Sequence, residues 1–159
     1  MFERILVPTD GSPAADAAVD AAIDMALSHS SVIEVLHVIQ TERVAGMPLE
    51  TTWVGITDVV RDEGEATVEA VAERAADAGV DVTTHVVAGT PSREIVRYAR
   101  ESDCDLIVMG TAGRDGLGRL LLGSVTEHVV RRSPIPVLTI RRQWETSGET
   151  APADAPAKG

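Results

Sequence analysis

The chain has 159 residues, of which 44% are hydrophobic, and a formal net charge of −11. This length and apolar content suit one domain with a substantial core, and no apolar run reaches the ~20 residues of a membrane span. The acidic balance argues against a nucleic-acid partner, because clustered basic side chains bind phosphate backbones. Cys104 is the only cysteine, which excludes an internal disulfide and a cysteine-rich metal site. The N-terminal residues do not resemble a signal peptide, so we expect a cytoplasmic protein.

Lysine and aromatic residues are scarce. Lys158 is the only lysine among 14 basic residues, and aromatic residues make up 3% of the chain. A dense acidic surface stays hydrated in concentrated salt, where ions screen its self-repulsion. We therefore interpret the composition as halophilic. An ordinary acidic protein with a GC-rich coding bias is the alternative.

Short apolar runs rich in β-branched residues alternate with helical patterns along most of the chain. The strand-like runs are residues 5–7, 32–39, 80–87, 106–109 and 137–140. Helical spacing predicts helices from Pro13 to about His29, from Val54 or Thr57 to Ala78, from Pro91 to about Ser102, and from about Gly123 to Arg132. Ser12 and Thr90 each precede a proline, as helix caps often do, and Gly79 suits a left-handed helix end.

This order of elements predicts an α/β fold with a single open, doubly wound parallel sheet of five strands. Continuously apolar strands favour a sheet covered by helices on both faces. We assign residues 1–142 to this domain, and the polar residues 143–159, rich in Ala, Pro, Gly and Thr, to a disordered tail. Residues 40–53 form a longer connection, and a lid, a partner contact or a simple tether are all compatible with its sequence.

A glycine-rich segment follows the strand-like run 106–109. Gly110, Gly113, Gly123 and Ser124 have the spacing G-x2-G-x9-G-S, and the last two open a helical pattern. Glycines let the backbone approach an anion closely, and the free N–H groups and dipole of a helix N-terminus stabilise its charge. We expect the amides of residues 123–125 to surround phosphates, with the Ser124 and Thr126 hydroxyls as further donors. Nucleotide binding is therefore the leading hypothesis.

Loop residues also follow the other expected strands. These are Pro8-Thr9-Asp10-Gly11-Ser12, His37-Val38 and Ala88-Gly89-Thr90-Pro91. Carboxyl ends of strands converge on one edge of a doubly wound sheet, so these segments should line one cleft. The Asp10 carboxylate could accept a hydrogen bond from a ribose hydroxyl or an exocyclic amine, or it could cap the neighbouring helix. His37 is more simply a hydrogen-bonded histidine in or near the core.

The segments PTDGS, G-x-P at Gly89 and Pro91, and G-x2-G-x9-G-S-V-T resemble the universal stress protein family, in its ATP-binding branch. The resemblance covers residues 2–141. It implies strand order 3-2-1-4-5, ATP as the ligand, a backbone contact from Val38 to adenine, and Gly89 at the floor of the site. It assigns the remaining nucleotide contacts to Pro8, Thr9, Asp10, Met109, Gly110, Gly113, Arg114, Gly123, Ser124 and Val125.

The resemblance also implies homodimers formed through the last strand, Ile135 to Ile140. The same strand carries Val137, Leu138 and Ile140, and an apolar sheet edge invites pairing with another chain. An edge protected by the chain's own tail is the alternative.

Two classes of function are compatible with these motifs. The first is a nucleotide-dependent stress-response or regulatory module, at most a slow ATPase. The second is a phosphohydrolase or nucleotidyl-transfer enzyme of related fold. A P-loop nucleoside triphosphatase is excluded because it needs the motif G-x4-G-K-[ST], and the glycine-rich segment contains no lysine. One arginine cannot neutralise a triphosphate in an acidic protein, so we expect Mg or Mn to accompany ATP.

Overall fold

The computed structural model describes residues 1–40, 53–111 and 122–141, with side chains in the second range described from residue 58. It contains a five-stranded sheet in the order β3-β2-β1-β4-β5, and every neighbouring pair of strands is parallel. The expected α/β fold and strand order are confirmed. The strands are β1 (Arg4–Pro8), β2 (Val32–Gln40), β3 (Val82–Gly89), β4 (Leu106–Gly110) and β5 (Val137–Ile140), and the helices are α1 (Pro13–His29), α3 (Trp53–Asp77), α4 (Pro91–Glu101) and α5 (Ser124–Arg132).

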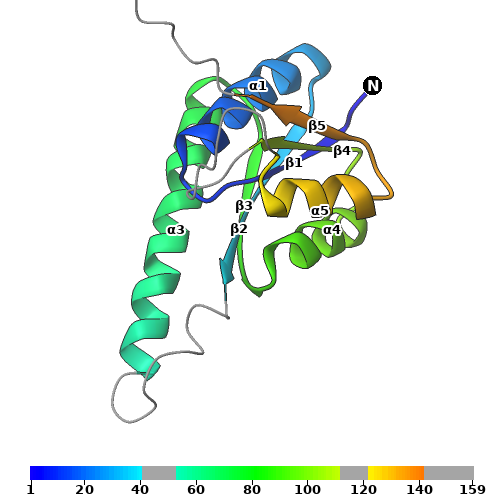
Figure 1. Ribbon diagram of the computed structural model, residues 1–159. Coiled ribbons are helices and arrows are strands. Elements are labelled where there is room, and N and C mark those ends of the chain that lie inside the picture. The colour runs from blue at the N-terminus through cyan, green and yellow to red at the C-terminus, as the bar shows by residue number, and fades with distance from the viewer. Residues whose placement is uncertain (41–52, 112–121, 142–159) are drawn as a thin grey trace, which may run out of the picture.

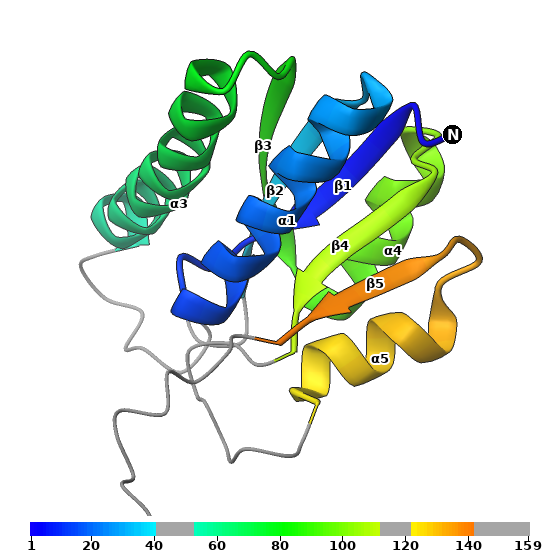
Figure 2. The same ribbon diagram turned by 90° about the horizontal axis from the view of Figure 1, so that it is seen from above.

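Helices cover both faces of the sheet (Figure 1). Helices α1 and α3 lie on one face and α4 and α5 on the other, as the view from above also shows (Figure 2). Each face has its own hydrophobic core, represented by Ile5 and Val35 under α1 and α3, and by Leu36 and Ile107 under α4 and α5. All four of these side chains are fully buried. Burial of a side chain of this size contributes roughly 1.5–3 kcal/mol, so the two cores are the main source of stability.

Local sequence explains how α1 begins and how closely it packs. The Ser12 side chain accepts a hydrogen bond from the Ala15 amide, and Pro13 occupies the first turn, where its missing N–H costs nothing. The buried residues of α1 are nearly all alanines, which let the helix axis lie close to the sheet. The sheet-facing side chains are therefore short where the helix crosses β4.

The starts of β2, β4 and β5 and both ends of α1 agree with the predictions, and most other bounds differ by one or two residues. The third strand begins at Val82 rather than at residue 80. Gly79 has a φ of +83°, and the amide of Val80 donates to the carbonyl of Ala75, so the end of α3 still holds Val80. The expected cap at Thr90 lies outside the helix as predicted, but its side chain makes no capping hydrogen bond.

A buried carboxylate lies under α4, in the amino-terminal half of β2. Glu34 is 3% exposed and accepts hydrogen bonds from Arg4, His85 and Tyr98 at 2.6, 3.0 and 3.1 Å. These partners come from β1, β3 and α4, so one side chain joins three elements. An unpaired carboxylate at this depth would be strongly unfavourable, and the three donors remove that cost.

None of the helices in the described ranges is long and apolar enough to cross a bilayer.

Candidate functional site

The carboxyl ends of the strands and the amino-terminal ends of α1 and α5 lie at the same edge of the molecule (Figure 2). Backbone hydrogen bonds connect the segments there. The Thr9 amide donates to the Leu36 carbonyl at 2.9 Å, and the Thr111 amide donates to the Ile140 carbonyl at 3.0 Å. The Gly123 amide donates to the Thr111 carbonyl, which brings the start of α5 to the end of β4. The structure thus brings the first loop and both described ends of the glycine-rich segment to one edge.

The loop between β1 and α1 is a tight turn built from its own side chains. The Thr9 hydroxyl accepts from the Gly11 amide at 3.2 Å, and the Asp10 carboxylate accepts from the Ser12 amide at 3.0 Å. Gly11 has a φ of +72°, a conformation that glycine adopts without strain. Ser12, rather than Asp10, caps the helix. The Asp10 carboxylate is therefore held at the edge of the sheet, next to the first turn of α1.

The amino-terminal end of α5 offers backbone N–H groups. Its N-cap residue is Gly123, with a φ of −58°, and no side chain caps this end of the helix. Ser124 is exposed there. Thr126 is 3% exposed, and its hydroxyl donates to the Gly110 carbonyl at 2.8 Å. The Thr126 proton thus points inward and joins the first turn of α5 to the end of β4.

Two of the glycines have a packing reason that does not depend on any ligand. A Cβ on Gly110 would lie 2.5 Å from the carbonyl oxygen of Ala14, so β4 meets the backbone of α1 at this point. Gly89 has a φ of +153°, and a Cβ there would lie 2.8 Å from Cγ of Glu94. Gly89 ends β3, two strands and roughly 10 Å from β1 at ordinary strand spacing. Both glycines are therefore required by packing, and their ligand contacts stay predictions.

The remaining predicted residues divide into two groups. Pro8 and Met109 are buried and Val38 is half-buried, so a ligand at this edge would meet the backbone of these residues. Gly113 and Arg114 lie outside the described residues, as do residues 41–52 of the long connection and residues 142–159, which include the predicted tail.

The sequence predicts His37 as a hydrogen-bonded histidine in or near the core, and its hydrogen bond to Thr9 agrees with this. The contact of this ring with Gly64 and the buried network of Glu34 were not predicted. The ring of His37 lies between the Thr9 carbonyl and Gly64 of α3. A glycine inside a helical pattern costs about 1 kcal/mol relative to alanine, and this signal could have marked Gly64 as a position of close packing. Glu34, an acidic residue inside an apolar strand, was the corresponding signal for the buried network.

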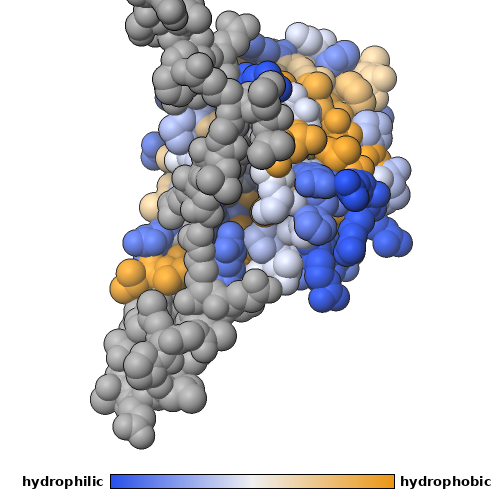
Figure 3. Space-filling view, viewed as in Figure 1, coloured by the Kyte–Doolittle hydropathy of each residue, from blue (hydrophilic) through white to orange (hydrophobic). Residues whose placement is uncertain are grey.

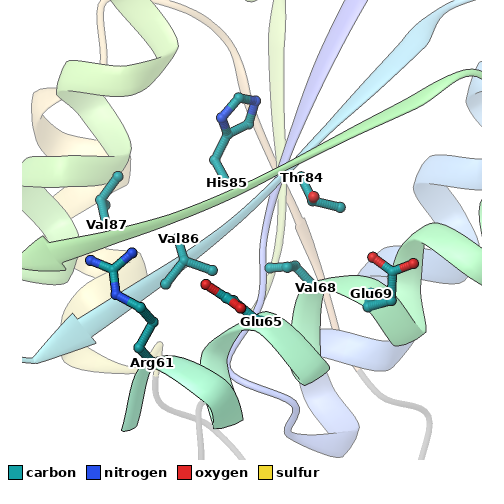
Figure 4. A pocket seen from close by; sticks show the side chains of 8 residues that line it. All are labelled: Arg61, Glu65, Val68, Glu69, Thr84, His85, Val86 and Val87. Atoms are coloured by element: carbon teal, nitrogen blue, oxygen red, sulfur yellow. The ribbon is translucent and has the colours of Figure 1, made fainter. Parts of the chain in front are cut away.

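A groove of about 430 Å³ lies elsewhere, between α3 and β3 (Figure 4). Helix α3 contributes Arg61, Glu65, Val68 and Glu69, and β3 contributes Thr84, His85, Val86 and Val87. In the described part of the chain, β3 is an edge strand of the five-stranded sheet, and the groove lies between this strand and α3. Its two glutamates disfavour an anionic ligand, so this groove is a poor candidate for phosphate binding.

The described residues offer little for metal or thiol chemistry. Within them, no three His, Cys, Asp or Glu side chains form a group that could hold a metal ion. Burial raises the pKa of the Cys104 thiol to about 12, so at neutral pH this cysteine is a protonated, buried side chain. Among the described residues, the edge offers backbone amides, hydroxyls and the Asp10 carboxylate.

Comparison with known proteins identifies the family. Residues 1–141 match the model of the universal stress protein family. The chain belongs to this family. Universal stress protein MJ0531 of Methanocaldococcus jannaschii is 35% identical over 142 residues, which cover 89% of this chain and 84% of that protein.

Solved structures of universal stress proteins have the same fold. The hypothetical protein MJ0577 of M. jannaschii is 31% identical, with a TM-score of 0.82 over 90% of this chain and 98% of that chain. A universal stress protein in complex with cAMP is 27% identical, with a TM-score of 0.65 over 88% of this chain and 97% of that chain.

Proposed function

We propose that this universal stress protein binds ATP at the carboxyl edge of its sheet and acts as a nucleotide-dependent stress-response module. The observation that carries the proposal is the meeting of the β1–α1 loop, the end of β4 and the uncapped start of α5 at one edge. Family membership and the relative in complex with cAMP support an adenine nucleotide as the ligand.

The donors at this edge suit a polyphosphate. Backbone N–H groups in the first turn of α5, the Ser124 hydroxyl and the positive end of the helix dipole would face the phosphate oxygens. The first turn of each helix carries one acidic residue, Asp16 in α1 and Glu127 in α5, but only α1 is capped by a side chain, that of Ser12. The first turn of α1 is therefore the weaker anion site. The phosphates therefore belong at α5, beside Gly110 and Gly123, the two motif glycines of the segment that the structure describes.

Asp10 and Val38 would then recognise the nucleoside. Asp10 follows the end of β1, and Val38 belongs to β2, the neighbour of β1 on the side away from β4. The Asp10 carboxylate would accept a hydrogen bond from a ribose hydroxyl, and the Val38 backbone would contact adenine.

We propose that Mg or Mn bridges the phosphates, since the protein itself is strongly acidic. No catalytic residue is assigned, and ATP hydrolysis would be slow at most.

We also propose that two copies pair through β5. Its register with β4 leaves the amides of Val137 and Thr139 directed to the open edge of the sheet. Leu138 is 36% exposed and Val130 of α5 is 45% exposed. Figure 3 shows apolar side chains gathered over β5. An antiparallel pairing about a two-fold axis would satisfy the open amides and bury this apolar surface.

Titration of ATP into purified protein tests the proposed site. Gly123→Val puts a branched side chain where the phosphates should approach, and a φ of −58° accepts valine, so the variant should fold. We expect ATP affinity to fall at least about tenfold, or ~1.4 kcal/mol. Ser124→Ala should weaken binding more mildly. Ser92→Ala, at the start of α4 beyond the β3 end, is the matched control and should bind as the wild type.

Two outcomes would count against the proposal. Unchanged ATP affinity in a folded Gly123→Val protein would remove the site from the start of α5. A wild type that binds no ATP would remove the function itself. The same titration with a chelator present tests the metal ion, because we expect affinity to fall when Mg and Mn are removed.

A further inference from the structure

The residue before Asp10 is held in place from β2 at both of its backbone groups. Strand β1 ends at Pro8, and Thr9 is 6% exposed. The Thr9 amide donates to the Leu36 carbonyl at 2.9 Å. The Thr9 carbonyl accepts from Nδ1 of His37, also at 2.9 Å. Consecutive residues of β2 thus fix the peptide groups on both sides of the Thr9 Cα, and the second of these contacts comes from a side chain.

The hydrogen bond determines the state of the His37 ring. A carbonyl oxygen has no proton to give, so Nδ1 must carry the hydrogen and donate it. A purely apolar side chain could fill the same space but could not bind this carbonyl. The His37 side chain therefore does more than fill the core beside the β1–α1 loop.

Helix α3 holds the ring from the opposite direction. Gly64 is buried in the middle of α3, and a Cβ on it would lie 2.9 Å from Cδ2 of His37 and 3.2 Å from Cγ1 of Val86. The helix backbone therefore lies against the imidazole, and the ring has little room to turn away from Thr9. This contact explains why a glycine occupies the middle of α3, although glycine is less favourable than alanine inside a helix.

The anchored peptide leads directly into Asp10. The carboxylate of Asp10 accepts from the Ser12 amide at 3.0 Å, and the Thr9 hydroxyl accepts from the Gly11 amide at 3.2 Å. The Thr9 carbonyl is fixed and the next two residues are held by these hydrogen bonds, so the loop has little conformational freedom. We propose that His37 is a positioning residue for the nucleotide site, which acts through the Thr9 carbonyl to place the Asp10 carboxylate beside the ribose. This inference rests on the proposed function.

Two substitutions separate the donor of His37 from its bulk. His37→Leu keeps an apolar side chain but removes the N–H, whereas His37→Asn supplies an N–H at a reach similar to that of Nδ1. We expect His37→Leu to weaken ATP binding at least about tenfold, and His37→Asn to restore it to within about threefold of the wild type. Urea denaturation of each variant checks that the loss of affinity is measured on folded protein.

A double-mutant cycle with Asp10 distinguishes positioning from a general structural effect. If His37 acts through Asp10, His37→Leu should lower ATP affinity by no more than about twofold in an Asp10→Asn background. A loss of the same size in both backgrounds would overturn the inference. Wild-type affinity in folded His37→Leu would overturn it as well, while leaving the proposed function intact.

The wild-type protein supplies a test that needs no variant. Nitrogen NMR of the His37 imidazole should show the proton on Nδ1 at neutral pH. A proton on Nε2 alone would mean that the Thr9 carbonyl is not bound by the ring, and would overturn the inference even if His37→Leu failed to fold. Absence of ATP binding by the wild type would overturn the proposed function and this inference together.

Discussion

At the scale of single residues, the same side chain or glycine often serves two purposes in this protein. Thr126 was expected to donate to a phosphate, yet its hydroxyl donates to the Gly110 carbonyl. Gly110 was expected to admit a phosphate, yet it also admits the backbone of α1. Residues around a proposed ligand site also make the contacts that hold its elements together. Buried backbone polar groups there need hydrogen-bond partners even when no ligand is bound.

The buried network of Glu34 gives the first prediction at this scale. Glu34→Gln removes the negative charge that binds Arg4 and His85, while an amide oxygen can still accept from Tyr98. We expect the free energy of unfolding to fall by about 1–3 kcal/mol, because charge-assisted hydrogen bonds are replaced by weaker ones in a buried place. Urea denaturation measures the change.

Glu73→Gln is the matched control, because Glu73 is an exposed residue of α3. Its stability should stay within about 0.5 kcal/mol of the wild type. Equal stability of Glu34→Gln and the wild type would show that the negative charge of Glu34 contributes nothing net to stability.

At the scale of elements, the close contact between α1 and β4 fixes the position of α1 at the carboxyl edge of the sheet. A Cβ on Gly110 would meet two backbone atoms of Ala14, at 2.5 Å from its oxygen and 2.6 Å from its carbonyl carbon. Backbone atoms inside a helix cannot rotate aside as a side-chain end can. The whole of α1 would have to shift, and with it the adjoining loop that holds Asp10.

We therefore expect Gly110→Ala to lower the free energy of unfolding by about 1–3 kcal/mol through overpacking. Gly79→Ala is the comparison, since Gly79 has a φ of +83° but no atom within 4 Å of a Cβ. That variant carries only the strain of a left-handed residue, about 1 kcal/mol. Chemical denaturation of both proteins ranks them, and a Gly110→Ala protein at least as stable as Gly79→Ala would contradict the close packing.

At the scale of the whole molecule, the two edge strands differ in what they expose. Strand β3 is bordered by the groove with Glu65 and Glu69, whereas β5 is short and carries the exposed Leu138. A charged border discourages a second chain from pairing, and an apolar edge invites it. This asymmetry is why the proposed homodimer uses β5.

Leu138→Lys tests the assembly because it places a charge in the proposed seam. Sedimentation in high salt should show the wild type as a dimer and the variant as a monomer. Val59→Lys is the control, since Val59 is an exposed apolar residue on α3, and this variant should remain dimeric. A wild type that is monomeric at micromolar concentration would contradict the proposal whatever the variants do.

The order and type of the elements could be read from the sequence because the signals are local. Apolar runs of strand length, Ser12 before Pro13 and the left-handed Gly79 depend on a few neighbouring residues. The spacing of the glycine-rich segment is local in the same sense, and it was enough to indicate the family. The start of β3 was wrong by two residues, because the end of α3 holds Val80 and pattern alone does not show which element binds a boundary residue.

Contacts between distant segments were decided only by the tertiary structure. The sequence by itself determined the order of the elements and indicated the family, and the edge at which a nucleotide should bind is a prediction made from it. It did not determine that Glu34 has three donors from three elements, that Gly110 faces Ala14, or that His37 lies between Thr9 and Gly64. Each of these contacts depends on packing distances between residues far apart in the chain. A local sequence pattern does not specify how closely two elements pack.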